Sequence, residues 1–136
     1  MSGKAESRLV YSSISMSERV ANLGVKGALL FTWLLTHCDS QGRMLGKPMV
    51  VKAEVVPFLE DITAEEVHGS LLKMADENLI YYYQDKKGRQ LIQVVDWWEY
   101  QSKLKHMSAS LYEAPDGWLD KLPQRDEQGR FTGSVP

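Results

Sequence analysis

Three cationic side chains stand close together in the second half of the chain. Lys86, Lys87 and Arg89 belong to the segment 85–89, which also contains a glycine. The segments on both sides are rich in Ile, Val, Leu and Tyr, so the sequence predicts a β-hairpin with these cations at its tip. Cations at a hairpin tip can contact nucleic-acid phosphates or enter a minor groove. The alternative is a charged turn that keeps the hairpin edge soluble, and both interpretations stay open.

Other residues suited to DNA binding precede the hairpin. A helix expected over residues 64–77 would offer Ser70 and Lys73 to a DNA groove. The carboxylates of the same helix would oppose a phosphate backbone, so a solvated or protein-facing surface competes with base reading here. The hairpin tip is therefore the better candidate. Arg43 and Lys47 would extend its basic surface if the fold brings them near.

Tyrosines in the first hairpin strand indicate a different kind of binding. Alternate residues of a strand share a face, so Tyr81 and Tyr83 lie on one face and Ile80 and Tyr82 on the other. A two-stranded hairpin buries only one face against its own core. We therefore expect the face with Tyr81 and Tyr83 to serve in self-association.

Residue patterns of common catalytic and metal sites are missing from the sequence. His37, Cys38 and Asp39 are consecutive, and helical neighbours point about 100° apart, so they cannot form a nucleophile–base pair among themselves. The sequence has no CxxC, no HExxH and no phosphate-binding glycine loop. We expect a protein that is not an enzyme and that uses no metal or other cofactor.

The spacing of apolar residues predicts the elements that position these side chains. A helix over residues 25–37 is apolar on nearly every face, so it is expected at the centre of the core. A very short strand follows at 43–45. Pro48 then suits the first turn of a helix over 49–56, although the β-branched residues of that segment argue against helix.

The second half carries stronger signals. Thr63 and Glu66 have the spacing of a capping box, which begins the amphipathic helix over 64–77. Strands are expected over 79–84 and 90–95. The predicted fold class is α+β, mainly α: a winged helix, the helix-turn-helix variant that ends in a two-stranded β-hairpin wing.

Size, charge and cysteine content limit the classes of protein to consider. With 136 residues, of which 43% are hydrophobic and 25% charged, the chain can bury one core. It has neither an apolar run long enough to span a membrane nor a secretory signal, and its single cysteine suits a reducing compartment. We expect a cytoplasmic protein without a membrane partner. The net charge of −2 limits any nucleic-acid site to a local basic patch.

Several stretches of the sequence, in their order and spacing, resemble one known family. Within residues 11–118 they are LLFTWLLTHCDSQGRMLGKP, VVPFLEDITAEEV, LLKMADENLIYYY before the glycine-containing turn, DWWEYQ and SASLYEAPDGW. This pattern resembles the N-terminal winged-helix domain of phage replication-initiation and replisome-organiser proteins, a group similar to the amino-terminal domain of DnaD-type primosome proteins. At Tyr100 the family often has His instead.

The resemblance implies a role in assembling the replication complex of a phage or prophage. One hypothesis is a module that binds double-stranded DNA, mainly through phosphate contacts of the wing. The alternative is a protein–protein interaction or oligomerisation module, a homodimer or higher homo-oligomer that contacts replication proteins without direct DNA readout.

The expected domain organisation has four parts. Residues 1–10 form an N-terminal arm and 11–101 the winged-helix domain. Residues 102–123 form a C-terminal extension packed on that domain, and 124–136 a flexible tail or a linker. Many members of the family carry further domains.

Overall fold

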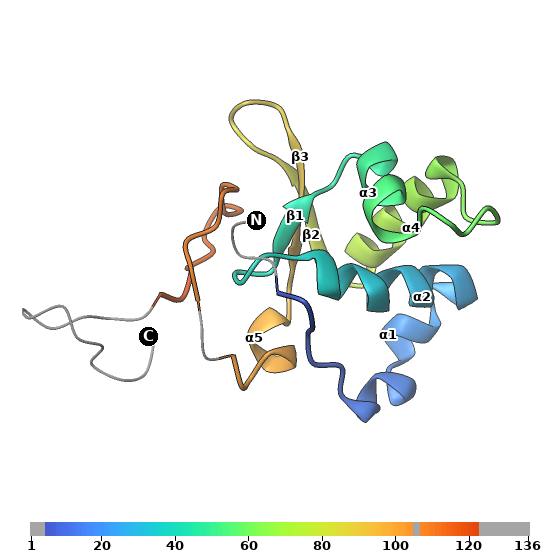
Figure 1. Ribbon diagram of the computed structural model, residues 1–136, viewed down its shortest axis with the longest axis horizontal. Helices are drawn as coiled ribbons and strands as arrows, with labels where there is room; N and C mark the ends of the chain where they lie inside the picture. Colours follow the sequence, from blue (N-terminus) through green and yellow to red (C-terminus); the bar gives the residue numbers. More distant parts are fainter. Residues whose placement is uncertain (1–4, 105–106, 123–136) are drawn as a thin grey trace, which may run out of the picture.

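The computed structural model of the chain describes residues 5–104 and 107–122. Over these residues the fold is α+β and mainly helical, with five α-helices, two short 3-10 helices and one three-stranded antiparallel sheet. The α+β, mainly helical class predicted from the sequence is thus confirmed. Helices α1 to α4 (residues 18–76) lie on one side of the sheet, and the C-terminal part of the described chain lies on the other side (Figure 1).

Helix α2 (Gly24–Leu34) forms the centre of the core, as its apolar sequence predicts. It follows a 3-10 helix, η1 (Ser12–Met16), and the one-turn helix α1 (Glu18–Ala21), and it tightens into η2 (Leu35–His37) at its end. Leu30, Phe31 and Leu34 have no exposed area, because α2 is covered by neighbouring elements on this side.

Helices α3 (Pro48–Val55) and α4 (Ala64–Asp76) pack against α2 and against each other. Pro48 occupies the first turn of α3, where its missing N–H leaves no hydrogen bond unmade. The predicted capping box is present: Glu66 N–H donates to Thr63 Oγ1 at 3.1 Å, and Thr63 N–H donates to Glu66 Oε1 at 3.3 Å. The buried side of α4 carries Val67, Leu71 and Met74.

The sheet contains β1 (Arg43–Leu45), β2 (Ile80–Gln84) and β3 (Gln90–Val94) in the order β1-β3-β2. β2 and β3 form the predicted hairpin, and β1 pairs with the other edge of β3. The face toward the helices, which we call the inner face, carries the buried side chains of Met44, Ile80, Ile92 and Val94. The opposite, outer face carries Arg43, Tyr81, Tyr83, Leu91 and Gln93.

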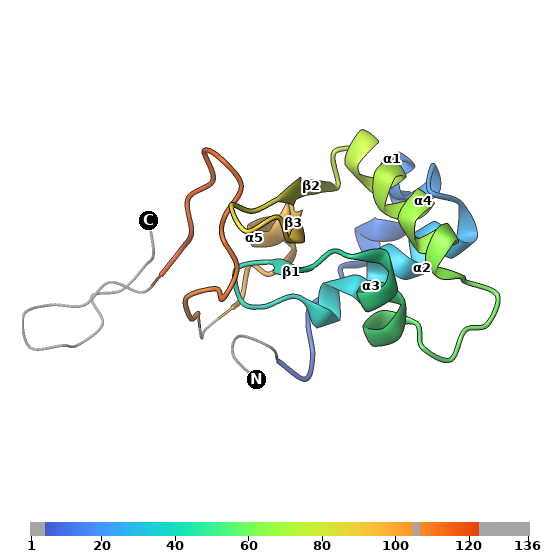
Figure 2. The same cartoon turned by 90° about the horizontal axis from the view of Figure 1, so that it is seen from above.

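The chain after β3 returns to the sheet. The one-turn helix α5 (Trp97–Tyr100) places the fully buried Trp97 against the turn before β1, where its Nε1–H donates to the carbonyl of Ser40 at 2.9 Å. Gly42 in that turn has φ +83°, and a Cβ there would lie 2.6 Å from the Trp97 ring, so this position requires glycine. Beyond α5, residues 107–122 run along the outer face of the sheet (Figure 2). We call residues 107–122 the C-terminal strap.

Candidate functional site

The hairpin tip is an ordered turn that holds two lysine side chains in solvent. The turn closes with two backbone hydrogen bonds of 3.0 Å, from Asp85 N–H to the Arg89 carbonyl and from Gly88 N–H to the Asp85 carbonyl. The Asp85 carboxylate folds the turn further by accepting from the backbone N–H groups of Lys87 and Arg89, at 2.9 and 2.8 Å. Lys86 and Lys87 are exposed. The tip rises above the rest of the sheet (Figure 1).

The charges at the tip divide into a paired cation and two unpaired ones. Burial alone would raise the pKa of the Asp85 carboxyl, but hydrogen bonds from Arg89 and from the Lys87 N–H outweigh it and lower the pKa. Asp85 is therefore ionised, and it accepts from Arg89 Nε at 2.8 Å. Within the described part of the chain, the side chains of Lys86 and Lys87 make no hydrogen bond or ion pair.

A groove connects the tip to the helices. It lies between the tip, the start of α3 and the exposed side of α4, and its volume is about 540 Å³. It brings together two cations proposed from the sequence, Lys47 and Arg89, with His68 of α4. The position of His68 in the sequence gives no sign of a site, because only the fold brings this exposed residue opposite the hairpin. Tyr82, whose hydroxyl donates to the Gly46 carbonyl at 2.7 Å, forms part of the wall.

Two of the proposed DNA contacts do not lie on this surface. Arg43 is 1% exposed, and its guanidinium donates to Gln93 Oε1 at 2.7 Å, to the Tyr112 carbonyl at 3.0 Å and to the Asp120 carboxylate. The expectation that Arg43 extends the basic surface is wrong, because the C-terminal strap covers its side chain. Ser70 is half-buried and faces α2, where a Cβ on Gly27 would lie 3.5 Å from the Ser70 Oγ.

Lys73 keeps its expected exposure. It lies on the solvent side of α4 with no ion pair among the residues that the structure describes. Glu65 and Asp76 of the same helix are also exposed, so α4 offers one cation among several carboxylates. The helix therefore adds little positive potential to the groove.

The tyrosine face of the hairpin, which we expect to serve in self-association, is partly covered by the chain itself, and Tyr81 remains 47% exposed. The Tyr83 hydroxyl donates to the Glu113 carbonyl at 2.6 Å, and the Tyr81 ring meets the Trp118 ring edge-on with centroids 6.0 Å apart. Burial under the strap raises the pKa of Tyr83 to about 12. The C-terminal strap thus contacts both tyrosines but leaves Tyr81 partly open to solvent.

The turn before β1 anchors the strap. Ser40 Oγ and Gln41 Nε2 both donate to the Ser108 carbonyl at 3.0 Å. Gln41 also bonds both backbone groups of Lys121, donating to its carbonyl at 2.7 Å and accepting from its N–H at 3.0 Å. Hydrophobic periodicity carries no signal for these contacts, because the partners are polar and distant in sequence.

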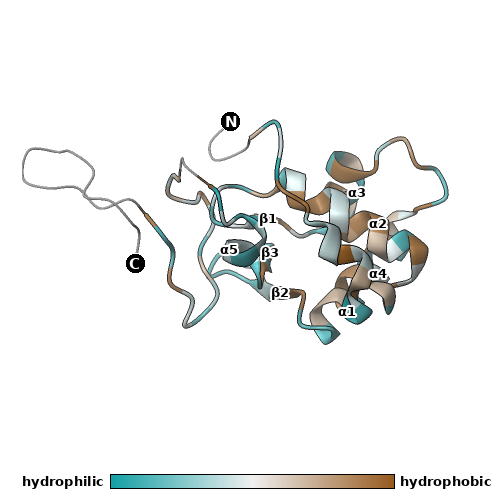
Figure 3. Cartoon of the chain, turned by 90° about the horizontal axis from the view of Figure 1, so that it is seen from below, coloured by the Kyte–Doolittle hydropathy of each residue, from teal (hydrophilic) through white to brown (hydrophobic). Residues whose placement is uncertain are grey.

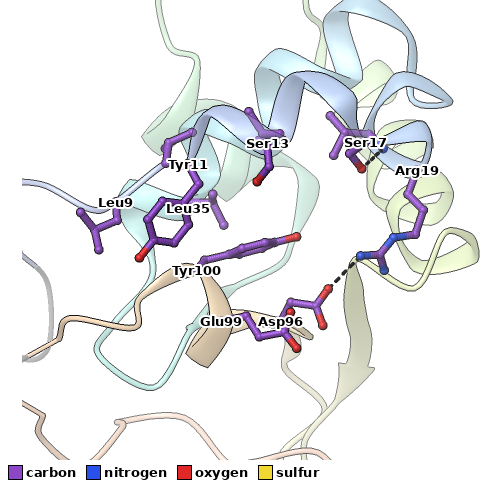
Figure 4. Close-up of a pocket in the computed structure, with 12 residues that line it drawn as sticks. Leu9, Tyr11, Ser13, Ser17, Arg19, Leu35, Asp96, Glu99 and Tyr100 are labelled. Carbon is purple, nitrogen blue, oxygen red and sulfur yellow. Dashed lines mark hydrogen bonds and ion pairs between the residues drawn. The ribbon is translucent and has the colours of Figure 1, made fainter.

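A second hollow, of about 180 Å³, lies between the N-terminal segment and α5 (Figure 4). Arg19 donates to Asp96 at 2.8 Å on its rim, and this hydrogen bond raises the pKa of the guanidinium. Tyr100 lines the hollow and packs edge-on against Phe31, with ring centroids 6.2 Å apart. None of the site residues proposed from the sequence lies here, and the packing gives Tyr100 a structural role.

The described residues contain no group of three or more His, Cys, Asp and Glu side chains that could hold a metal ion. None of their helices has the length and apolar character needed to cross a membrane. Comparisons of the chain with protein-family models, with curated proteins and with solved structures found no match.

Proposed function

We propose that the chain is a winged-helix module that binds nucleic-acid phosphates through its hairpin. The element order α2, β1, α3, α4, β2, β3 and the sheet order β1-β3-β2 support this interpretation, since a winged helix places its hairpin directly after the second helix of a helix-turn-helix. In this interpretation α4 is the recognition helix and the β2–β3 hairpin is the wing.

The unpaired, exposed Lys86 and Lys87 on an ordered turn carry the proposal. Because the backbone of the turn is already ordered, little backbone freedom is lost when its lysines meet a phosphate backbone. The adjoining groove adds Lys47 and Arg89, so phosphates that pass from the tip into the groove would meet further cations. The acidic α4 makes base reading by the proposed recognition helix weak, and the binding is therefore expected to tolerate many sequences.

Fluorescence anisotropy of a labelled duplex tests the proposal. Between about 50 and about 200 mM salt the affinity should fall steeply, because each phosphate contact releases counterions. The double variant Lys86→Ala/Lys87→Ala should bind more weakly and lower the slope of log affinity against log salt by about two. Lys103→Ala, which removes an exposed lysine beyond α5, is the matched control and should leave the slope unchanged. An absence of binding at about 50 mM salt would refute the proposal.

We place this activity in the initiation of phage or prophage DNA replication, in the cytoplasm. The resemblance over residues 11–118 supports this placement. Affinity purification of the chain from phage-infected cells should recover replication proteins, and their absence from repeated purifications would count against it.

The alternative function is a protein-interaction or oligomerisation module without DNA readout. The strap leaves only part of the tyrosine face, chiefly Tyr81, open to a second copy of the chain. A different surface, at the far end of the helical layer, does support binding of a partner protein.

A further inference from the structure

Two apolar side chains at the far end of the helices are almost fully exposed. Phe58, in the connection between α3 and α4, is 91% exposed, and Val25, in the first turn of α2, is 87% exposed. With Leu29 and Leu59 they line a hollow of about 450 Å³. Figure 3 shows the connection as a hydrophobic stretch followed by a hydrophilic one. We call these four residues the Phe58 patch.

The connection that presents Phe58 is held firmly on both sides. Lys52 Nζ donates to the carbonyls of Val56 at 2.8 Å and Leu59 at 2.7 Å. Lys26 Nζ donates to the Asp61 carbonyl at 2.7 Å, and Thr63 with Glu66 caps the following helix. Phe58 is therefore exposed on an ordered segment, and binding there would require little further ordering of the backbone.

The rim of the patch is acidic. Glu60 and Asp61 line the hollow, are exposed and, within residues 5–104 and 107–122, make no ion pair. Lys26, the cation that lines the hollow, is paired with Glu66 at 2.8 Å, and its hydrogen bond lowers the pKa of that carboxyl, so Glu66 is ionised as well. An apolar floor with a negative rim results.

We propose that the Phe58 patch is a docking surface for a cationic, amphipathic segment of another protein. An apolar side chain of the segment enters the hollow, and its Lys or Arg side chains face Glu60 and Asp61. The same charges repel nucleic acid and anionic membranes. They also disfavour a symmetric dimer through this patch, because its two-fold axis would bring like carboxylates together.

A synthetic helical peptide of Leu and Lys, about four turns long, is the probe, and the same peptide with Glu for Lys is its counterpart. The Lys peptide should bind saturably and shift the backbone NMR signals of the patch residues. Phe58→Ser should weaken its binding at least about tenfold, because a central aromatic anchor is lost. Leu119→Ser, at an 86% exposed leucine of the C-terminal strap, is the matched control and should change nothing.

The charge of the rim has its own test. The double variant Glu60→Lys/Asp61→Lys should bind the Lys peptide more weakly and the Glu peptide more tightly than the unmodified chain does. Equal binding of the two peptides to the unmodified chain overturns the proposal, as does equal binding of the Lys peptide to Phe58→Ser, or no saturation up to about 1 mM.

Analytical ultracentrifugation tests whether a second copy of this chain occupies the patch instead. A self-associated chain that Phe58→Ser dissociates would show that the patch takes a second copy, and it would overturn the proposed partner. Lys86→Ala/Lys87→Ala should leave peptide binding intact, so failure of this docking surface and failure of the proposed nucleic-acid site are distinguishable.

Discussion

The two faces of the three-stranded sheet are held by different forces. On the inner face Met44, Ile80 and Ile92 are buried in one apolar cluster with the helices. On the outer face Arg43 and Gln93 are equally buried, yet they are held by directional hydrogen bonds to each other, to the turn before β1 and, from Arg43, to the strap. Apolar burial scales with area and tolerates changes of shape, whereas a buried polar contact is costly to leave half-made. The faces should therefore respond differently to substitution.

Arg43→Ala should have the largest effect on stability. Arg43 is buried whereas Asp120 is partly exposed, so the loss comes mainly from the hydrogen bonds of the guanidinium. A hydrogen bond that involves a charged group typically contributes about 1.5–3 kcal/mol, and Arg43 makes several, to Gln93, Tyr112 and Asp120. The free energy of unfolding, measured by urea denaturation, should fall accordingly. Amide hydrogen exchange at Ser108 and Lys121, whose N–H groups bond the turn before β1, should accelerate more than exchange in α4. Uniform acceleration would mean that the strap does not depend on Arg43.

Ile92→Ala probes the inner face and should cost about 2–4 kcal/mol, through lost burial and a cavity. Unlike Arg43→Ala, this substitution should destabilise the whole core. Amide hydrogen exchange should therefore accelerate by the same factor in the strap and in α4. Ile92→Val, expected to cost about 1 kcal/mol, shows whether the loss follows the deleted volume. If Ile92→Ala accelerated hydrogen exchange in the strap more than in the helices, the proposed difference between the two faces would be wrong.

Tyr83→Phe should cost about 1 kcal/mol at neutral pH, since it deletes the hydrogen bond to the Glu113 carbonyl. The pKa of Tyr83 is raised to about 12 in the folded chain, against about 10 in an unfolded one. The stabilisation from keeping the phenol neutral is thus complete below the unfolded value and is lost as the pH rises toward the folded one. Between about pH 10 and about pH 12 the free energy of unfolding should therefore fall more steeply with pH for the unmodified chain than for Tyr83→Phe. Parallel curves would show that Tyr83 is solvated.

The double variant Lys86→Ala/Lys87→Ala should have the smallest effect on stability, within about 0.5 kcal/mol, because both side chains are exposed and unpaired. Thermal unfolding checks this value. A larger loss would show that the lysines support the hairpin, and weaker nucleic-acid binding by this variant would then need a structural explanation.

The contrast between the faces also explains what the sequence could predict. The capping box of Thr63 and Glu66, the buried side of α4 and the hairpin follow from local spacing, and the structure confirms them. The inner face follows from alternation along each strand.

The outer face does not follow from local patterns. The partner of Arg43 is 77 residues away, so its sequence neighbourhood resembles that of a surface cation. Tyr81 and Tyr83 alternate as expected for a solvent-facing or self-associating side, because nothing nearby in the sequence announces the strap. His68 joins the groove only through the packing of α4 beside the hairpin.

The long separation between the turn before β1 and the strap has a consequence for the order of folding. The contacts of Ser40 and Gln41 with the strap span 67 to 80 residues, whereas the hairpin and the capping box close over a few residues. Contacts that close long loops cost more chain entropy and tend to form later. During synthesis Arg43 cannot pair with the carboxylate of Asp120 until almost all of the described chain has been translated. We expect the helices and the hairpin to collapse first, and the outer face to close as a late step of folding.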